Sequence, residues 1–203
     1  MKNLVRLKET NMVRELIRAP LLKKSSDLFN IASSLLDIGL LQEDDFRTRY
    51  NKFSYRLFVD MDGVLTDWMG QYTKFGGKPF ESHDDIDWEV AESIEFWSEM
   101  GWLEGGKDLW KSLTHLDPII LSSPGASRFA REGKQMWIKK NLGERVNSII
   151  TEVKQDYSDP RSILIDDMAK NIDPWVADDG IGILYTGSPS SAARSLYRSV
   201  MGG

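Results

Sequence analysis

The sequence predicts an α/β protein built on a doubly wound, Rossmann-like parallel sheet. Short apolar runs alternate with helix-length amphipathic stretches from residue 57 onward, which is typical of a parallel sheet with helices on both faces. Several of these runs end in aspartate or serine. Because ligands bind beyond the carboxyl ends of parallel strands, these endings predict a polar site at one edge of the sheet.

Residues 1–54 are expected to form a helical extension ahead of an α/β domain at 55–203. Apolar residues recur at helical spacing at 12–17 and again at 28–36. Residues 1–24 carry seven Lys or Arg against two Glu, which a solvated helix face explains most simply. The extension carries no catalytic pattern. Its expected roles are self-association, docking to a partner or covering an edge strand.

Composition narrows the class of protein further. With 41% hydrophobic and 28% charged residues, the 203-residue chain has the composition of an ordinary globular protein. It has no cysteine, which excludes disulfides and thiolate metal ligands and suits a reducing compartment. No run approaches the roughly 18 apolar residues of a membrane span, and the first residues lack the apolar core of a signal peptide. We therefore expect a cytoplasmic protein without membrane partners.

The apolar runs of the α/β domain are each short enough for one buried strand. The expected strands are Leu57–Asp60, Pro118–Ser123, Val146–Thr151, Ser162–Asp167 and Ile181–Thr186. Helices are expected at Lys107–Leu116 and Ser127–Leu142. A last helix should follow Ser188 as its cap, with Pro189 in the first turn, where proline is favoured.

The connection between the first two strands is far longer than a crossover requires. It holds about fifty residues, against the dozen or more that a crossover needs. The excess, at about 68–106, is expected to form a small helical cap over the polar edge. Most of its aromatic residues are expected to be core. Trp68 and Phe75 follow soonest after the acidic strand end and are candidates for stacking on a nucleobase.

Polar residues that suit phosphate chemistry follow successive strands. They occur as Asp-x-Asp-Gly, then Ser-Ser, then lysine, then Asp-Asp: Asp60, Asp62, Ser122, Ser123, Lys134, Lys154, Asp166 and Asp167. Each group alone has a simpler explanation, such as a turn or a helix cap. Their succession at strand ends favours one shared site.

This order resembles that of the haloacid dehalogenase (HAD) superfamily of phosphohydrolases. The segments "DMDGVLTD", "ILSSPG" and "ILIDDMAKNI" are similar to its first, second and fourth motifs. The segments "GKQMWIKKNLG" and "FWSEMGWLEGGKDLW" are similar to its 5'(3')-deoxyribonucleotidase (5'-nucleotidase type C) branch. The resemblance runs from Arg56 to Tyr197 and implies a HAD-like sheet with a cap inserted after the first core strand.

The chemistry of phosphate esters gives the acidic residues distinct expected roles. Asp60 is expected to attack phosphorus and form an aspartyl-phosphate. Asp62 is expected to protonate the leaving oxygen and then to deprotonate water. A hard cation such as Mg2+ would lie between Asp60, Asp166 and the phosphate. The resemblance implies that the backbone carbonyl of Asp62 is a further metal ligand.

The remaining residues are expected to bind the substrate phosphate or to support the metal. Ser122 and Ser123 offer hydroxyl and backbone donors. Either Lys154 or Lys134 is the main cation for the phosphate, and the sequence leaves that choice open. Asp167 is expected either to complete the metal shell through water or to orient Lys154.

These roles predict a Mg2+-dependent phosphomonoesterase acting on a nucleoside monophosphate, with a deoxyribonucleotide favoured. The alternatives keep the chemistry and change the substrate to a sugar phosphate, another small metabolite or a nucleic-acid 3'-phosphate. The basic residues 1–24 could serve as a docking or nucleic-acid arm, but a solvated helix face is the simpler explanation, and a nucleic-acid partner is not expected. A receiver-like domain is disfavoured because the Asp-Asp pair comes late and follows the lysine. A non-catalytic module is disfavoured because no expected catalytic position is substituted.

Overall fold

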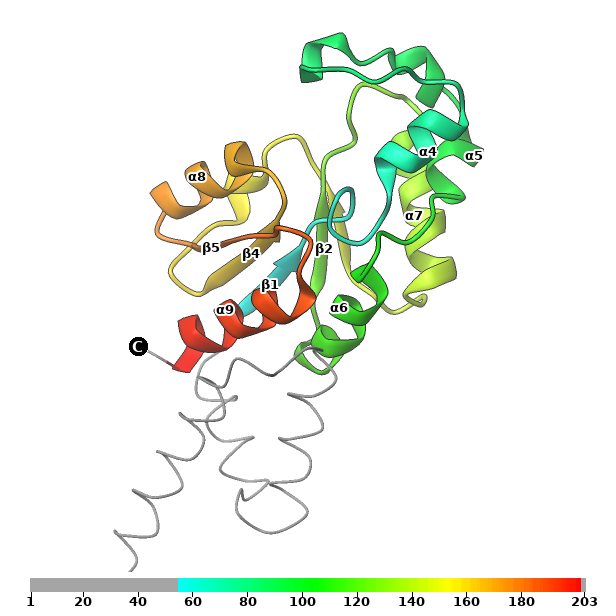
Figure 1. The fold of residues 1–203 in the computed structure, drawn as a ribbon. Coiled ribbons are helices and arrows are strands. Elements are labelled where there is room, and N and C mark those ends of the chain that lie inside the picture. Colours follow the sequence, from blue (N-terminus) through cyan, green and yellow to red (C-terminus); the bar gives the residue numbers. More distant parts are fainter. Residues whose placement is uncertain (1–54, 202–203) are drawn as a thin grey trace, which may run out of the picture.

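The computed structural model describes residues 55–201, so the helices expected before residue 55 lie outside the described residues. An all-parallel five-stranded sheet forms the centre of the described part (Figure 1). Its strands are β1 (Arg56–Val59), β2 (Ile119–Ser122), β3 (Ser148–Ile150), β4 (Ser162–Asp166) and β5 (Ile181–Leu184), in the order β3-β2-β1-β4-β5. The first and last residues of each strand differ by at most two positions from those of the run predicted for it. The predicted α/β class with a parallel sheet is confirmed.

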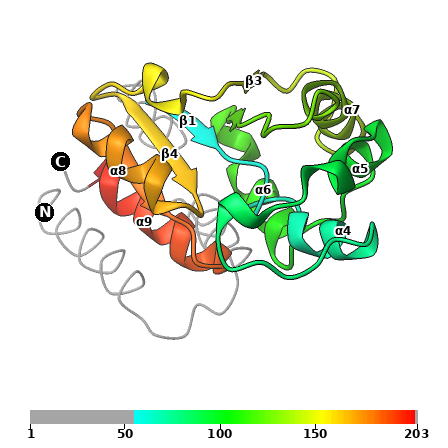
Figure 2. The ribbon, with the colours of Figure 1, turned by 90° about the horizontal axis from the view of Figure 1, so that it is seen from above.

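The two faces of the sheet are apolar because alternate strand residues point to opposite sides. Leu57 and Val59 belong to a core with residues of α6 (Gly106–Leu113), α7 (Ala130–Asn141) and α9 (Pro189–Met201). Phe58 belongs to a second core with α8 (Ala169–Ala177), where its ring lies 5.3 Å from that of Trp175. In the view from above, α8 and α9 lie at the left of the picture and α7 at the right (Figure 2), although α9 belongs to the same core as α7.

The predicted helices also appear, with bounds set by local caps. The run expected at Lys107–Leu116 forms α6 followed by the 3-10 turn η3 (Thr114–Leu116). α9 begins at Pro189, and the Ser188 hydroxyl accepts a hydrogen bond from the Ser191 amide.

Among the described residues, no helix combines the length and the apolar character needed to cross a membrane.

The strand order reverses direction between β1 and β4. The chain leaves β1 toward β2 on one side, whereas it leaves β4 toward β5 on the other. Since β1 and β4 are neighbours, the two connections diverge from a common point. Such a switch point is where open α/β sheets bind ligands. The loops after β1 and β4 carry the predicted acidic residues.

A long insertion separates β1 from α6. It contains α4 (Trp68–Lys74), η1 (His83–Asp85), η2 (Trp88–Ala91) and α5 (Ile94–Ser98). Its two ends are tied together, because Thr66 forms an antiparallel bridge with Trp102 and the Leu103 amide donates to the Leu65 carbonyl at 2.8 Å.

The insertion is attached to the core through α5 and α7, which lie side by side in both views (Figures 1 and 2). A Cβ atom at Gly133 would come within 2.4 Å of the Trp97 Cβ, so the two helices meet at this glycine. The Trp137 indole donates to the Met100 carbonyl at 2.7 Å, and Lys140 pairs with Glu99 at 2.8 Å. These contacts fix this part of the insertion beside the carboxyl edge of the sheet.

Candidate active site

The loop after β1 turns sharply and depends on a glycine. The Met61 carbonyl accepts hydrogen bonds from the amides of Leu65 and Thr66, both at 2.8 Å. Gly63 has a φ of 77°, a left-handed conformation that favours glycine. A Cβ atom there would also lie 2.2 Å from an oxygen of Asp167. The Gly63 turn therefore lets the loops after β1 and β4 approach each other.

Three carboxylates gather where these loops meet. Oxygens of Asp60, Asp166 and Asp167 all lie within 4.8 Å of one another. Asp60 is 5% exposed and Asp166 is fully buried. Asp60 Oδ1 is buried and lies 2.8 Å from the Lys154 ammonium, without a well-aligned hydrogen bond. Three carboxylates that each offer an oxygen at one point suit a hard divalent cation such as Mg2+.

The charge state of the cluster reflects its crowding. Asp167 is exposed as a residue, but desolvation of its carboxyl group raises its pKa to about 7, with further contributions from the nearby charges of Asp60 and Asp166. Burial also raises the pKa of Asp166, again with the charge of Asp60 adding to the effect. Bringing these carboxylates together is therefore unfavourable when all of them are ionised. A bound cation would relieve that repulsion.

Lys154 supplies part of the neutralising charge. It opens the 3-10 turn η4 (Lys154–Tyr157), and its Nζ lies 2.8 Å from Asp60 Oδ1 and 2.6 Å from Asp166 Oδ2. Burial alone would lower the pKa of Lys154, but the charges of Asp60 and Asp166 outweigh it and the pKa is raised. Lys154 is therefore a buried ammonium that bridges two of the three clustered carboxylates.

Lys134 forms a second cationic centre at the same edge of the sheet. It lies in α7 with its side chain 1% exposed. Its Nζ is 2.6 Å from Asp62 Oδ2 and 3.1 Å from Ser122 Oγ, and it also donates to the Ser123 carbonyl. The Trp97 ring of the insertion lies 5.0 Å from the same nitrogen. The structure thus brings both candidate lysines to the site, each beside a different aspartate of the Asp-x-Asp pair.

The two serines after β2 have different surroundings. Ser122 is buried and accepts from Lys134, which leaves its own O–H available to donate. The Ser123 hydroxyl donates to Glu152 at 3.1 Å. Ser122 therefore faces the inner part of the site, whereas Ser123 is held toward its outer edge.

The two candidate stacking residues differ in how much ring they leave open. The Trp68 ring is stacked on Tyr72, with centroids 4.9 Å apart and planes at 13°, and it also meets the ring of Phe96. Phe75 is 39% exposed and touches Phe96 edge-on at 5.4 Å. One face of Trp68 is thus covered by the protein, and Phe75 offers the more accessible ring.

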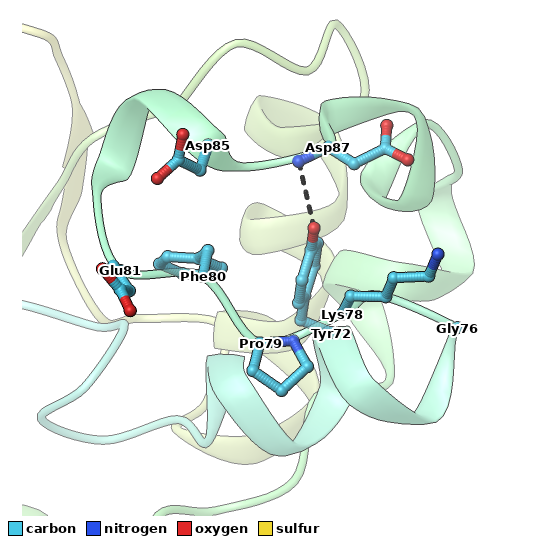
Figure 3. Close-up of a pocket in the computed structure, with 8 residues that line it drawn as sticks. All are labelled: Tyr72, Gly76, Lys78, Pro79, Phe80, Glu81, Asp85 and Asp87. Carbon is cyan, nitrogen blue, oxygen red and sulfur yellow. Dashed lines mark hydrogen bonds between the residues drawn. The ribbon is translucent and has the colours of Figure 1, made fainter.

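The insertion also forms an open pocket of about 430 Å³ (Figure 3). The residues that line it all belong to the insertion: Tyr72, Gly76, Lys78, Pro79, Phe80, Glu81, Asp85 and Asp87. The Tyr72 hydroxyl at its wall accepts a hydrogen bond from the Asp87 amide at 3.0 Å. None of the clustered carboxylates or lysines lines this pocket. It is separate from the group of residues described above.

Two side chains at the site were not anticipated from the sequence. Thr66 donates from Oγ1 to Asp62 Oδ1 at 3.0 Å. Asn171 donates to both oxygens of Asp166, at 3.0 and 3.1 Å. Asn171 lies five residues after Asp166 within the quoted segment "ILIDDMAKNI", so its position near the start of a helix was a usable signal. Thr66 lies four residues after Asp62 within the quoted segment "DMDGVLTD", but only the fold of the turn after β1 brings its hydroxyl to Asp62.

The arrangement combines a cluster of three carboxylates that could hold a metal ion, a fourth carboxylate paired with a buried ammonium, and a buried hydroxyl 3.1 Å from that ammonium. Such a set can bind an anion, hold a cation and move a proton. The sequence matches no known family model, and no curated protein matches it. The functional conclusion therefore depends on the residues of this chain.

Proposed function

We propose that this protein is a Mg2+-dependent phosphomonoesterase of the HAD type that hydrolyses a nucleoside monophosphate through an aspartyl-phosphate. One observation carries the proposal. Asp60 lies at a strand end within a three-carboxylate cluster, and two buried lysines lie beside that cluster and beside Asp62. A phosphate ester needs this combination of nucleophile, cation site and proton carrier.

Charge explains why a metal belongs in the proposal. Four aspartates at the site face two ammonium groups, so the carboxylates outnumber the cations before any phosphate arrives. Attack by one anion on another is repulsive. Asp60, Asp166 and Asp167 would hold Mg2+, which when bound neutralises charge on the transferring phosphoryl group. The backbone carbonyl of Asp62 is the further ligand that the family resemblance implies.

The chain's own residues account for the two chemical steps. An Asp60 oxygen forms a bond to phosphorus as the ester oxygen leaves, and Asp62 gives that oxygen a proton. Water then attacks the aspartyl-phosphate while Asp62 takes a proton from it, which releases phosphate and restores Asp60. Lys134 and the Ser122 hydroxyl, 3.1 Å apart, would bind phosphate oxygens, with Lys134 exchanging its hydrogen bond to the Ser123 carbonyl for one to the phosphate. Lys154 pairs with both Asp60 and Asp166 and so holds the two carboxylates in place.

The aromatic insertion supports a nucleotide substrate. Phe75 presents an accessible ring, and stacking of a base on an aromatic side chain contributes about 1–3 kcal/mol. A sugar phosphate would gain nothing from that ring. Comparing nucleotides with sugar phosphates therefore tests the substrate class separately from the chemistry.

The test is phosphate release from a panel of 5'- and 3'-mononucleotides and sugar phosphates, with Mg2+ and with chelator. We expect turnover of nucleotides that requires the metal. Asp60→Asn preserves shape and should lower kcat by about a thousandfold or more. Asp173→Asn, at an exposed carboxylate on α8, is the matched control and should leave kcat unchanged. A folded Asp60→Asn protein with near-normal activity would reject the mechanism, and turnover of sugar phosphates alone would reject the substrate class.

A further inference from the structure

The Thr66 hydroxyl lies beside the Asp62 carboxylate in a fully buried position. Its Oγ1 is 3.0 Å from Asp62 Oδ1 and 3.1 Å from the Met61 carbonyl oxygen. Thr66 itself is 0% exposed. A hydroxyl has a single proton to donate, so these two acceptors compete for it. The Met61 carbonyl already accepts hydrogen bonds from the amides of Leu65 and Thr66, both at 2.8 Å, which favours the bond from the hydroxyl to Asp62.

Both oxygens of Asp62 then have a defined partner. Lys134 donates to Oδ2 at 2.6 Å and Thr66 donates to Oδ1 at 3.0 Å. With only one of these bonds, the carboxylate would be free to rotate about its Cβ–Cγ bond. With both, the direction in which Asp62 faces is fixed.

The backbone holds Thr66 rigidly enough for this purpose. Its amide donates to the Met61 carbonyl at 2.8 Å, and its carbonyl accepts from the Gly63 amide at 3.0 Å. It also bridges Trp102, where the insertion returns to the core. A donor fixed in this way contributes more to orientation than one on a mobile side chain.

We propose that Thr66 is a positioning residue that orients Asp62 for proton transfer. The inference rests on the proposed function, since it assigns Asp62 the proton-transfer role. Thr66 acts through Asp62 and makes no contact with the reacting phosphate. It explains why a hydroxyl occupies a buried site that a valine would fill equally well by shape.

Two variants, one that keeps the shape of the side chain and one that keeps its hydroxyl, test this role. Thr66→Val keeps the branched shape and removes the hydroxyl, whereas Thr66→Ser keeps the hydroxyl and removes a methyl group. We expect Thr66→Val to lower kcat about tenfold or more with little change in KM, because orientation is lost in the transition state and not in binding. Thr66→Ser should retain kcat within about threefold. Equal loss of kcat in both variants would assign the effect to packing and overturn the proposal.

A second measurement does not depend on activity. The carboxyl carbon resonance of Asp62, assigned by its loss in Asp62→Asn, should shift in Thr66→Val and stay near its wild-type position in Thr66→Ser. An unshifted resonance in Thr66→Val would mean that the Thr66 hydroxyl donates to the Met61 carbonyl and not to Asp62, which would overturn the proposal. If the wild-type chain released phosphate from no substrate, the proposed function would fail, and the role in proton transfer would fail with it. In that case a shifted resonance would still establish the hydrogen bond.

Discussion

Replacing Lys154 by methionine should destabilise the metal-free protein far more than losing an ordinary surface lysine. Methionine has a similar length but leaves Asp60 and Asp166 without their shared ammonium group. The Nζ lies 2.8 Å from one carboxylate and 2.6 Å from the other. At an effective dielectric constant of about 20, each contact corresponds to about 6 kcal/mol of Coulomb attraction.

The measurable loss is smaller than the sum of these attractions, because the wild-type ammonium is itself dehydrated in the folded state. Breaking a buried ion pair by removing one partner costs about 3–5 kcal/mol. We expect a loss of that size in the free energy of unfolding at pH 8. The assay is denaturant unfolding followed by tryptophan fluorescence, in the presence of chelator. Mg2+ should then stabilise the variant more than the wild type, because the ion would replace the missing positive charge.

Lys140→Met is the matched control. Lys140 also pairs with a carboxylate at 2.8 Å, but its side chain is 59% exposed and that of Glu99 is 54% exposed. Such surface pairs contribute about 1 kcal/mol or less. If Lys154→Met costs no more than Lys140→Met, the reasoning from burial is wrong.

Two further predictions concern the loops that meet at the cluster. Gly63→Ala should lower the free energy of unfolding by about 1–2 kcal/mol, because residue 63 has a left-handed φ, as denaturation would measure. It should also weaken Mg2+ binding by displacing Asp167, as a metal titration would measure. Unchanged metal affinity would contradict the close approach of Gly63 to Asp167. Because the pKa of Asp167 is raised to about 7, the folded protein keeps a proton that the unfolded chain releases at about pH 4. The free energy of unfolding of the metal-free protein, relative to that of Asp167→Asn, should therefore fall as pH rises from about 4 to 7 and then level off. Apparent Mg2+ affinity should rise over the same pH range because the ion displaces that proton, and an affinity independent of pH would exclude this linkage.

The positions of the strands and of the acidic site residues could be predicted from local sequence. A buried parallel strand must be apolar along its length, so the run before Asp60 and the run before Asp166 stand out without reference to the rest of the chain. Parallel strands also place their carboxyl ends at one edge. The meeting of Asp60 with Asp166 and Asp167 therefore follows from fold class and spacing, and the cluster in the structure agrees with it.

The partners of the two lysines could not be predicted in this way. Lys134 lies within a helix and Lys154 opens a short turn, and neither position in the sequence specifies which carboxylate the side chain will reach. Packing of α7 against the insertion directs Lys134 to Asp62, whereas η4 directs Lys154 to Asp60 and Asp166. The sequence left open which lysine would be the main cation for the phosphate. In the structure the two lysines have different partners, Lys134 pairing with Asp62 and Lys154 with Asp60 and Asp166.

The sequence by itself determined an apolar, parallel sheet with acidic strand ends, because burial and strand geometry act over a few neighbouring residues. Only the tertiary structure decided the strand order, the partners of each lysine, the covering of Trp68 by Tyr72 and the contact of Thr66 with Asp62. Those features depend on side chains far apart in the chain, or joined through a turn, whose directions are set by packing. Their energies arise only once the sheet, α7 and the insertion lie against one another.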